Sequence, residues 1–333
     1  MKASKLNNPK ARPALRLVST KDMSREQWLK VRQTGIGASD AAAAVGLNPY
    51  QSQLELWMIK TGREDQLPQI DPEDDSAPTY WGHILEPIVA KHYAKRTGHK
   101  VRRVNSVLQH PDEDKAWMLA NLDYSVVGAT DVQILECKTA GEFGARLWRD
   151  GVPEYVQCQV QHQLAVTGKA AADVCVLLCG QEIQIHRIER DEALIARLVE
   201  LERRFWEYVQ TDTPPPADGS ESAGAALRYL YPQDQGETLD LTDDPHLCQV
   251  FNQLVTAREQ LKALNQREGL LKQLIQQAMG EASRATFARG SVSWKRSKAS
   301  QVLNTEAVLR DLPELMQEYQ ITRPGSRRFL VRS

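Results

Sequence analysis

Apolar, largely β-branched residues fill two short runs of the chain, 124–127 and 132–135, on either side of a Gly-Ala-Thr turn. Two such runs around a glycine-bearing turn predict a β-hairpin. Asp123 and Glu136 lie at equal distances from the turn centre, which falls halfway between residues 129 and 130. Antiparallel pairing therefore places the two carboxylates opposite each other, with Cβ atoms about 5 Å apart.

Three polar side chains converge at the open end of this predicted hairpin. Side chains alternate between the faces of a strand, so Glu136 and Lys138 share a face while Cys137 points away. Opposed carboxylates repel unless a proton or cation lies between them, and oxygen ligands suit Mg²⁺ or Mn²⁺. A metal-bound water attacks phosphorus, and a nearby lysine orients that water or stabilises the pentavalent phosphate. The alternative is a surface hairpin with a screened Asp–Glu–Lys ion pair.

A further acidic residue falls in a predicted helix. Apolar residues at positions 84, 85, 88, 89 and 93 recur with helical spacing, which predicts a helix with one buried face. Glu86 lies near the expected start of this helix, where an acid complements the helix dipole. The functional interpretation makes Glu86 the third carboxylate of the metal site.

A pattern suited to phosphate occurs closer to the N-terminus. Glycines at positions 35 and 37 precede Ser39, which we expect to cap an alanine-rich helix at residues 40–44. A helix N-terminus led by glycines and a hydroxyl favours a phosphate, and Arg32 offers a fork of donors to the same group. A plain N-cap with a solvated Arg32 is the alternative.

The rest of the pattern predicts a large N-terminal domain and a smaller C-terminal region. A helix follows the hairpin and places Tyr155, Gln159 and His162 on one face. Two strands and an amphipathic helix come next, and leucines at helical spacing recur beyond a proline-rich stretch. We therefore expect a loose leader at 1–22, a domain at 23–210, a linker at 211–225, and a helical region with a small basic hairpin at 226–333.

Composition limits the binding partners and the cellular compartment that we expect for the protein. The net charge of −1 and the isoelectric point near 6.7 give no overall attraction to nucleic acid, so DNA binding requires a local basic groove. The five cysteines are scattered without a CxxC pair, which argues against a zinc ribbon or disulfide framework and fits a reducing cytoplasm. We see neither an apolar run long enough to span a membrane nor the apolar core of a signal peptide.

Three blocks, taken in order, resemble a known family. They are RQTGIGASDAAAAVGLNPYQS, WGHILEP, and NLDY followed by LECK and QCQVQHQLAVTG. Together they resemble the YqaJ-type viral recombinases, which include the lambda-like exonucleases of the PD-(D/E)XK nuclease superfamily. The resemblance covers roughly residues 24–210. It implies an α/β fold with a mixed central sheet, here joined to a C-terminal helical and β-hairpin appendage.

The resemblance also implies roles for individual residues. It assigns metal binding to Glu86, Asp123, Glu136 and the backbone carbonyl of Cys137. It assigns catalysis to the same three acids together with Lys138 and Gln159. It assigns binding of the 5′-phosphate of DNA to Arg32 and Ser39. The implied cofactor is Mg²⁺, with Mn²⁺ as a substitute. The implied partners are double-stranded DNA ends, a single-strand annealing protein, and further copies of the chain in a trimer.

The leading hypothesis is a metal-dependent 5′-to-3′ exodeoxyribonuclease that makes 3′ single strands for phage-type recombination in the cytoplasm of a bacterial host. An endonuclease of the same superfamily is one alternative. An iron–sulfur nuclease is disfavoured because the sequence has no clustered set of four cysteines. A protein that binds DNA ends, or recruits a partner through its C-terminal region, is the non-enzymatic alternative.

Overall fold

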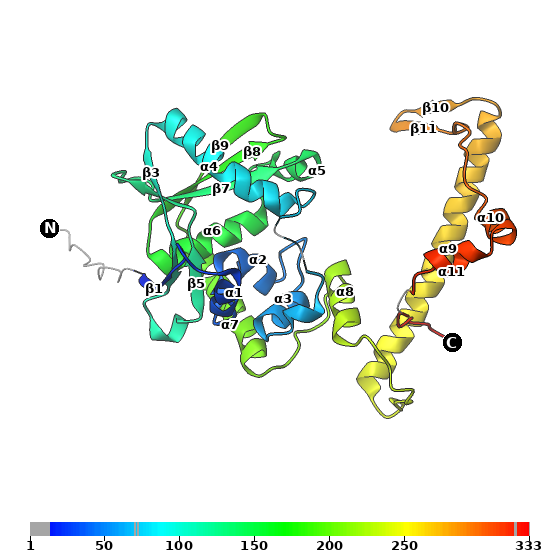
Figure 1. Ribbon diagram of the computed structural model, residues 1–333, viewed down its shortest axis with the longest axis horizontal. Helices are drawn as coiled ribbons and strands as arrows, with labels where there is room; N and C mark the ends of the chain where they lie inside the picture. Colours follow the sequence, from blue (N-terminus) through cyan, green and yellow to red (C-terminus); the bar gives the residue numbers. More distant parts are fainter. Residues whose placement is uncertain (1–13, 70, 72, 323–324, 333) are drawn as a thin grey trace, which may run out of the picture. The chain divides into compact units, whose positions relative to one another are not determined.

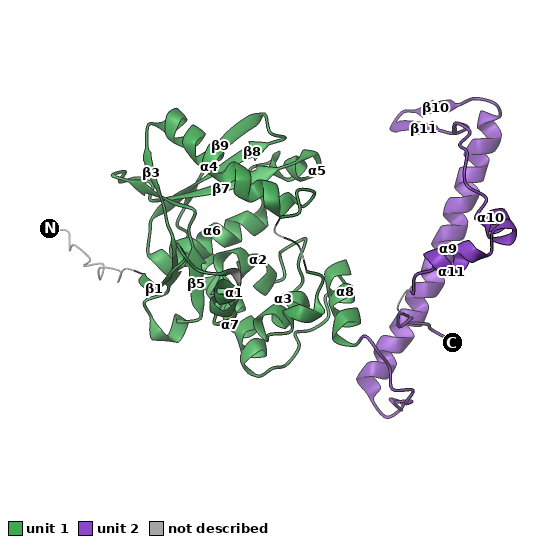
Figure 2. Cartoon of the chain, in the orientation of Figure 1, with its two compact units in different colours: residues 1–231 green, residues 232–333 purple. Residues whose placement is uncertain are grey.

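The computed structural model describes residues 14–69, 71, 73–322 and 325–332, and the chain divides into two compact units, 1–231 and 232–333 (Figure 2). The expected leader lies partly outside the described residues. Its described part contains strand β1, Leu15–Ser19, which pairs antiparallel with β4, Ser106–Gln109. This segment is thus part of a sheet, whereas the sequence suggested a loose leader.

The main sheet of the first unit has five strands in the order β3-β6-β7-β8-β9 (Figure 1). Its β7 and β8 run parallel and the other neighbours are antiparallel, so the sheet is mixed and the expected α/β class is confirmed. The strands are Lys100–Arg103, Tyr124–Val127, Ile134–Ala140, Ala171–Leu178 and Glu182–Glu189.

The central hairpin has the predicted register. Tyr124 pairs with Leu135 and Ser125 with Ile134, which corresponds to a turn centred between residues 129 and 130. The second strand begins two residues later than expected, although the N–H of Val126 still donates to the carbonyl of Gln133 at 3.0 Å. If the same register continues by one residue, Asp123 lies opposite Glu136.

Two helices cover opposite faces of this sheet (Figure 1). Helix α4, Pro78–Thr97, packs Val89 and Tyr93 against a core that includes Leu135. Helix α6, Glu154–Thr167, packs against the other face in a core that includes Ile134. Leu135 and Ile134 are neighbours on one strand but pack into cores on opposite faces of the sheet. Side chains therefore alternate between the two faces, as the site prediction assumes.

The start of α4 differs from the prediction. The helix begins at Pro78, which occupies the first turn, so Glu86 lies in its middle and not near its start. The sequence placed the start near Glu86 because the apolar residues with helical spacing begin at Ile84, and Pro87 lies inside the helix in the structure. Glu86 is therefore too far from the helix N-terminus to complement the helix dipole.

A second sheet in the same unit has the order β1-β4-β5-β2. Its β5, Met118–Asn121, runs parallel to the two-residue strand β2, Ile36–Gly37. Gly35 is required beside this pair, because a Cβ there would lie 2.3 Å from the carbonyl oxygen of Trp117. The surrounding helices are α1, Arg25–Gln33; η1, Ala38–Asp40; α2, Ala41–Ala44; α3, Gln53–Lys60; and α7, Glu192–Gln210.

The expected linker contains the start of a helix. Helix α8, Glu221–Leu230, packs on α3 within the first unit. The Ser222 hydroxyl accepts the N–H of Ser52 at 2.8 Å and donates to Glu55 Oε2 at 2.6 Å. The division between the units therefore falls after Tyr231, while the sequence placed it at the end of a linker over 211–225.

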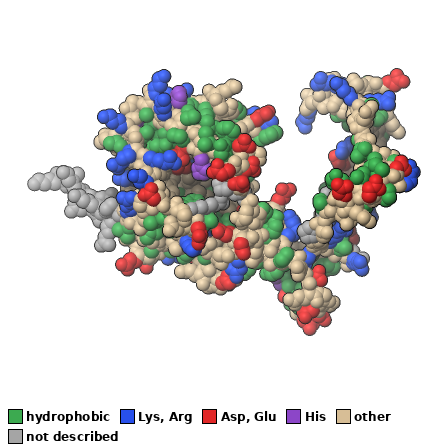
Figure 3. All heavy atoms as spheres, in the orientation of Figure 1, with side chains coloured by type: hydrophobic (Ala, Val, Ile, Leu, Met, Phe, Trp, Pro, Cys, Tyr) green, Lys and Arg blue, Asp and Glu red, His purple; other side chains and the backbone are tan. Residues whose placement is uncertain are grey.

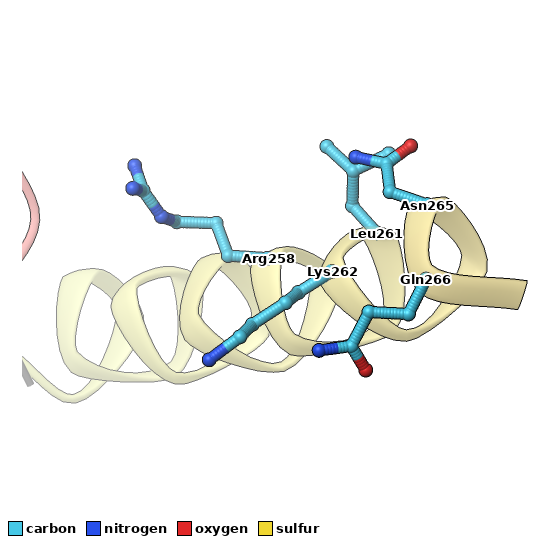
Figure 4. A pocket seen from close by; sticks show the side chains of 5 residues that line it. All are labelled: Arg258, Leu261, Lys262, Asn265 and Gln266. Atoms are coloured by element: carbon cyan, nitrogen blue, oxygen red, sulfur yellow. The ribbon is translucent and has the colours of Figure 1, made fainter. Parts of the chain in front are cut away.

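The second unit is built on one continuous helix, α9, Pro245–Met279. A β-hairpin follows, in which β10, Arg284–Phe287, pairs with β11, Gly290–Ser293, as the sequence predicted. Short helices α10, Thr305–Asp311, and α11, Glu314–Tyr319, complete the unit. One side of α9 forms an open hollow lined by Arg258, Leu261, Lys262, Asn265 and Gln266 (Figure 4). No helix among the described residues is long and apolar enough to cross a membrane.

Candidate active site

The hairpin brings two carboxylates together at the edge of the α6-covered face. Asp123 immediately precedes β6, and its Oδ2 accepts the backbone N–H of Cys137 at 2.8 Å. Glu136 lies on β7 with a side chain that is only 3% exposed. The Cys137 side chain packs into the core on the α4 side. The structure thus brings Asp123 and Glu136 together as the sequence predicted.

Lys138 completes this group from the same strand and the same face. Its Nζ lies 2.8 Å from Glu136 Oε1 and donates to Gln159 Oε1 at 2.9 Å. About a quarter of the Lys138 side chain remains exposed, in contrast to the buried Glu136. The ammonium group is therefore held between Glu136 and Gln159, while part of the Lys138 side chain is open to solvent.

Two glutamines of α6 hold the two oxygens of Glu136 separately. Gln159 Nε2 donates to Oε1 at 2.6 Å, and Gln163 Nε2 donates to Oε2 at 2.7 Å. Gln163 is fully buried, and its own Oε1 has no hydrogen-bond partner among the described residues. Sequence reasoning selected Gln159 but missed Gln163, although a spacing of four residues places both on one helix face.

The other two residues expected on that helix face have different surroundings. His162 is buried, where Nδ1 lies 2.7 Å from Glu202 Oε1 and Nε2 lies 3.0 Å from the Leu119 carbonyl oxygen. Tyr155 packs its ring edge-on against Tyr50. The α6 residues that contact Glu136 are thus the two glutamines, and His162 contributes to the core.

Burial and like charge determine the protonation of the site. Burial, followed by the charge of Glu136, raises the pKa of Asp123 to about 8, and Glu86 adds a smaller contribution. Burial lowers the pKa of Lys138, but the adjacent Glu136 carboxylate outweighs it, so the pKa ends above its ordinary value. Lys138 is therefore an ammonium group at neutral pH and acts as a hydrogen-bond donor.

Glu86 lies within electrostatic reach of this group without joining it. It pairs with Arg103 of β3, whose Nη2 lies 3.2 Å from Glu86 Oε1. That oxygen is buried and accepts no hydrogen bond from the described residues. Within the described part of the chain, no three His, Cys, Asp or Glu side chains are close enough to hold a metal ion as they stand. The expected cage of three carboxylates is therefore not closed in this structure.

The predicted phosphate site is arranged differently from expectation. Helix α2 has only four residues, and Asp40, not Ser39, occupies its N-cap position without a side-chain capping bond. Ser39 lies in η1 and is exposed, and η1 packs against α6. Arg32 is not simply solvated, because its guanidinium contacts Asp40 Oδ1 and lies 4.8 Å from the centre of the Trp28 ring.

Comparisons with known proteins identify the family of this chain. Asp123 precedes β6, and Glu136 and Lys138 lie on the neighbouring strand β7 of the mixed sheet. Residues 27–170 match the model of the YqaJ-like viral recombinase domain. The protein called "Uncharacterized protein YqaJ" from Bacillus subtilis strain 168 is 33% identical over 307 residues, which cover 91% of this chain and 92% of that protein. The chain belongs to the YqaJ-like viral recombinase family.

Solved structures similar to this chain include two exonucleases. An alkaline exonuclease from Laribacter hongkongensis matches with a TM-score of 0.46 and 25% identity, over 56% of this chain and 93% of that chain. A phage-related exonuclease from Haemophilus somnus 129PT matches with a TM-score of 0.38 and 12% identity, over 56% of this chain and 99% of that chain.

Proposed function

We propose that this protein is a Mg²⁺-dependent deoxyribonuclease that degrades linear duplex DNA from its 5′ ends. The observation that carries the proposal is the pairing of the half-buried Asp123 with the buried Glu136, with the Lys138 ammonium 2.8 Å from Glu136. Membership of a viral recombinase family supports DNA as the substrate and recombination as the setting. In this proposal the product is a 3′ single strand for an annealing protein in the bacterial cytoplasm.

The donor atoms of the site fit a hard divalent cation. Asp123 and Glu136 provide carboxylate oxygens, and the Cys137 carbonyl on the same strand adds a neutral oxygen. Glu86 has a buried oxygen without a hydrogen bond, so exchanging Arg103 for a cation would satisfy it. When bound, Mg²⁺ or Mn²⁺ supplies an acidified water and neutralises the charge that develops on the phosphate.

The protein side chains orient the reacting groups. Lys138, whose side chain is about a quarter exposed, donates hydrogen bonds and stabilises negative charge on the phosphate that undergoes attack. Gln159 and Gln163 each fix one oxygen of Glu136, so the carboxylate cannot rotate when the substrate binds. The site therefore needs little rearrangement of Glu136 in the transition state.

A basic surface near the site suits the DNA backbone. Strand β3 exposes Lys100, Arg102 and Arg103, and Lys and Arg side chains gather over and around this strand (Figure 3). Such a patch attracts phosphates locally even though the whole chain is almost neutral. On the other side of α6, Arg32 and Ser39 would bind the 5′-terminal phosphate and thereby set the polarity.

An assay with separately labelled strands tests this function. Linear duplex labelled at its 5′ or 3′ ends is incubated with Mg²⁺ or EDTA, and closed circular duplex is incubated in parallel. We expect early release of the 5′ label as short products, late release of the 3′ label, and no cleavage in EDTA. Cleavage of the circle would identify an endonuclease instead, and inert linear DNA would favour a protein that only binds DNA ends.

Replacing Gln163 with methionine should lower kcat by about tenfold to a hundredfold. The change removes one hydrogen bond to a charged group, which contributes about 1.5–3 kcal/mol. Gln157→Met is the matched control, because that exposed glutamine of the same helix donates to the Val152 carbonyl and to no carboxylate among the described residues. Steady-state cleavage of linear duplex measures the effect, and equal rates for both variants would contradict the role of Gln163.

A further inference from the structure

A buried charge cluster lies outside the group of residues around Glu136. Lys60, the last residue of α3, places its Nζ 2.6 Å from Asp40 Oδ2 and 2.7 Å from the Arg32 carbonyl oxygen. The N–H of Gly37 donates to Asp40 Oδ2 at 3.1 Å, and the Arg32 guanidinium contacts Asp40 Oδ1. Three elements, α1, η1 and α3, thus meet at one carboxylate.

The burial of the three charged side chains differs sharply. The Lys60 side chain is 0% exposed and that of Asp40 is 3% exposed, whereas 26% of the Arg32 side chain reaches the surface. Removing Lys60 and Asp40 from water is costly unless each is paired and hydrogen-bonded, as both are here. Only Arg32 can contact a ligand from solution.

The cluster places two basic side chains on one acid, although burial lowers the pKa of Lys60, and Asp40 only partly offsets this. Arg32 and Lys60 share the single carboxylate of Asp40, and Glu64 acts on the pKa of Lys60 more weakly than Asp40 does. Because Lys60 holds Oδ2, Arg32 is left with Oδ1 and keeps most of its five N–H donors for another acceptor. A phosphate monoester carries the charge and the acceptor oxygens that such a guanidinium binds best.

We propose that Asp40 and Lys60 are positioning residues that hold the Arg32 guanidinium toward the terminal phosphate monoester of a DNA 5′ end. Lys60 neutralises Asp40 on one oxygen, so Asp40 orients Arg32 without cancelling its charge. The Trp28 ring supports the guanidinium from its own helix. The inference rests on the proposed role of Arg32 at the 5′-phosphate and adds the two buried residues that create the selectivity.

The test measures binding and does not depend on cleavage. Short hairpin duplexes with one open end, carrying either a 5′-phosphate or a 5′-hydroxyl, are titrated with the full-length protein in EDTA. We expect the wild-type protein to bind the phosphorylated end about tenfold more tightly, which corresponds to about 1.4 kcal/mol. In Lys60→Met the ratio should fall to about one, because Asp40 then pairs with Arg32 alone.

Two further variants keep the test decisive. Asp40→Asn combined with Lys60→Met removes both buried charges without leaving either unpaired, and it should also lose the selectivity because Arg32 loses its anchor. Lys30→Met removes an exposed lysine that pairs with Glu26, and it should keep the tenfold ratio. Thermal unfolding confirms that each variant is folded.

The outcomes separate this inference from the proposed nuclease activity. A tenfold ratio retained in both Lys60 variants, or equal weakening for both ends, would overturn the positioning role. Equal affinity of the wild-type protein for both ends would overturn it as well. A wild-type protein that selects phosphorylated ends but never cleaves DNA would contradict the nuclease and leave the inference intact.

Discussion

Lys138→Met should lower the rate of phosphodiester cleavage by about a thousandfold while the affinity for duplex DNA in EDTA changes little. The magnitude is that of removing a preorganised donor from a site where charge develops during the reaction. Lys138 is such a donor, because its Nζ is fixed by Glu136 at 2.8 Å and by Gln159 at 2.9 Å. Loss of a binding contact alone would instead raise KM and spare kcat.

The protonation of Lys138 gives this prediction a second readout. Its pKa is raised above the ordinary value, so it keeps its proton throughout the neutral range and loses it only as the pH rises beyond that value. The ion pair with Glu136 therefore stabilises the fold at neutral pH and is lost in strong alkali. A cleavage rate that fell through neutrality in the wild-type protein would not come from deprotonation of Lys138.

Lys169→Met is the matched control for this experiment. Lys169 is an exposed lysine directly beyond the C-terminal end of α6, so its replacement removes the same charge from the same unit. We expect wild-type rates from this variant. Equal rates for Lys138→Met and Lys169→Met would show that the ammonium group has no part in the chemistry.

The parts of the site that lie close together in the sequence were predictable. The position of a turn determines the register of a hairpin, and period-two alternation determines which side chains share a face. These two rules place Asp123 opposite Glu136 and Lys138 beside Glu136, as the structure has them. Both rules act over a few residues, so no knowledge of the tertiary structure was needed.

The parts that depend on packing between distant elements were not predictable in the same way. Lys60 resembles an ordinary basic residue near a helix end, and only the meeting of three elements buries it against Asp40. Gln163 contacts Glu136 because α6 packs on that face of the sheet, which a single helix pattern does not reveal. Glu86 was assigned to a helix start because the apolar periodicity begins at Ile84, whereas the polar first turns of α4 begin at Pro78.

The position of Glu86 leads to an expectation about the metal. Asp123 lies beside the buried Glu136, while Glu86 remains paired with Arg103. A divalent cation would take the place of the proton that the raised pKa leaves on Asp123, and it would compete with Arg103 for Glu86. Binding of the ion should therefore stabilise the folded protein even when no DNA is present.

We expect Mg²⁺ or Mn²⁺ at about a hundred times its dissociation constant to stabilise the wild-type protein by about 2.7 kcal/mol, which raises Tm by about 5 °C. EDTA should reverse this shift and abolish cleavage. Asp123→Asn should lose both effects, because an amide has no acidic proton to give up to the cation and binds a hard cation more weakly than a carboxylate does. The exposed Asp218 provides the control Asp218→Asn, which should keep them. Differential scanning calorimetry measures Tm, and an equal shift in both variants would place the cation elsewhere in the protein.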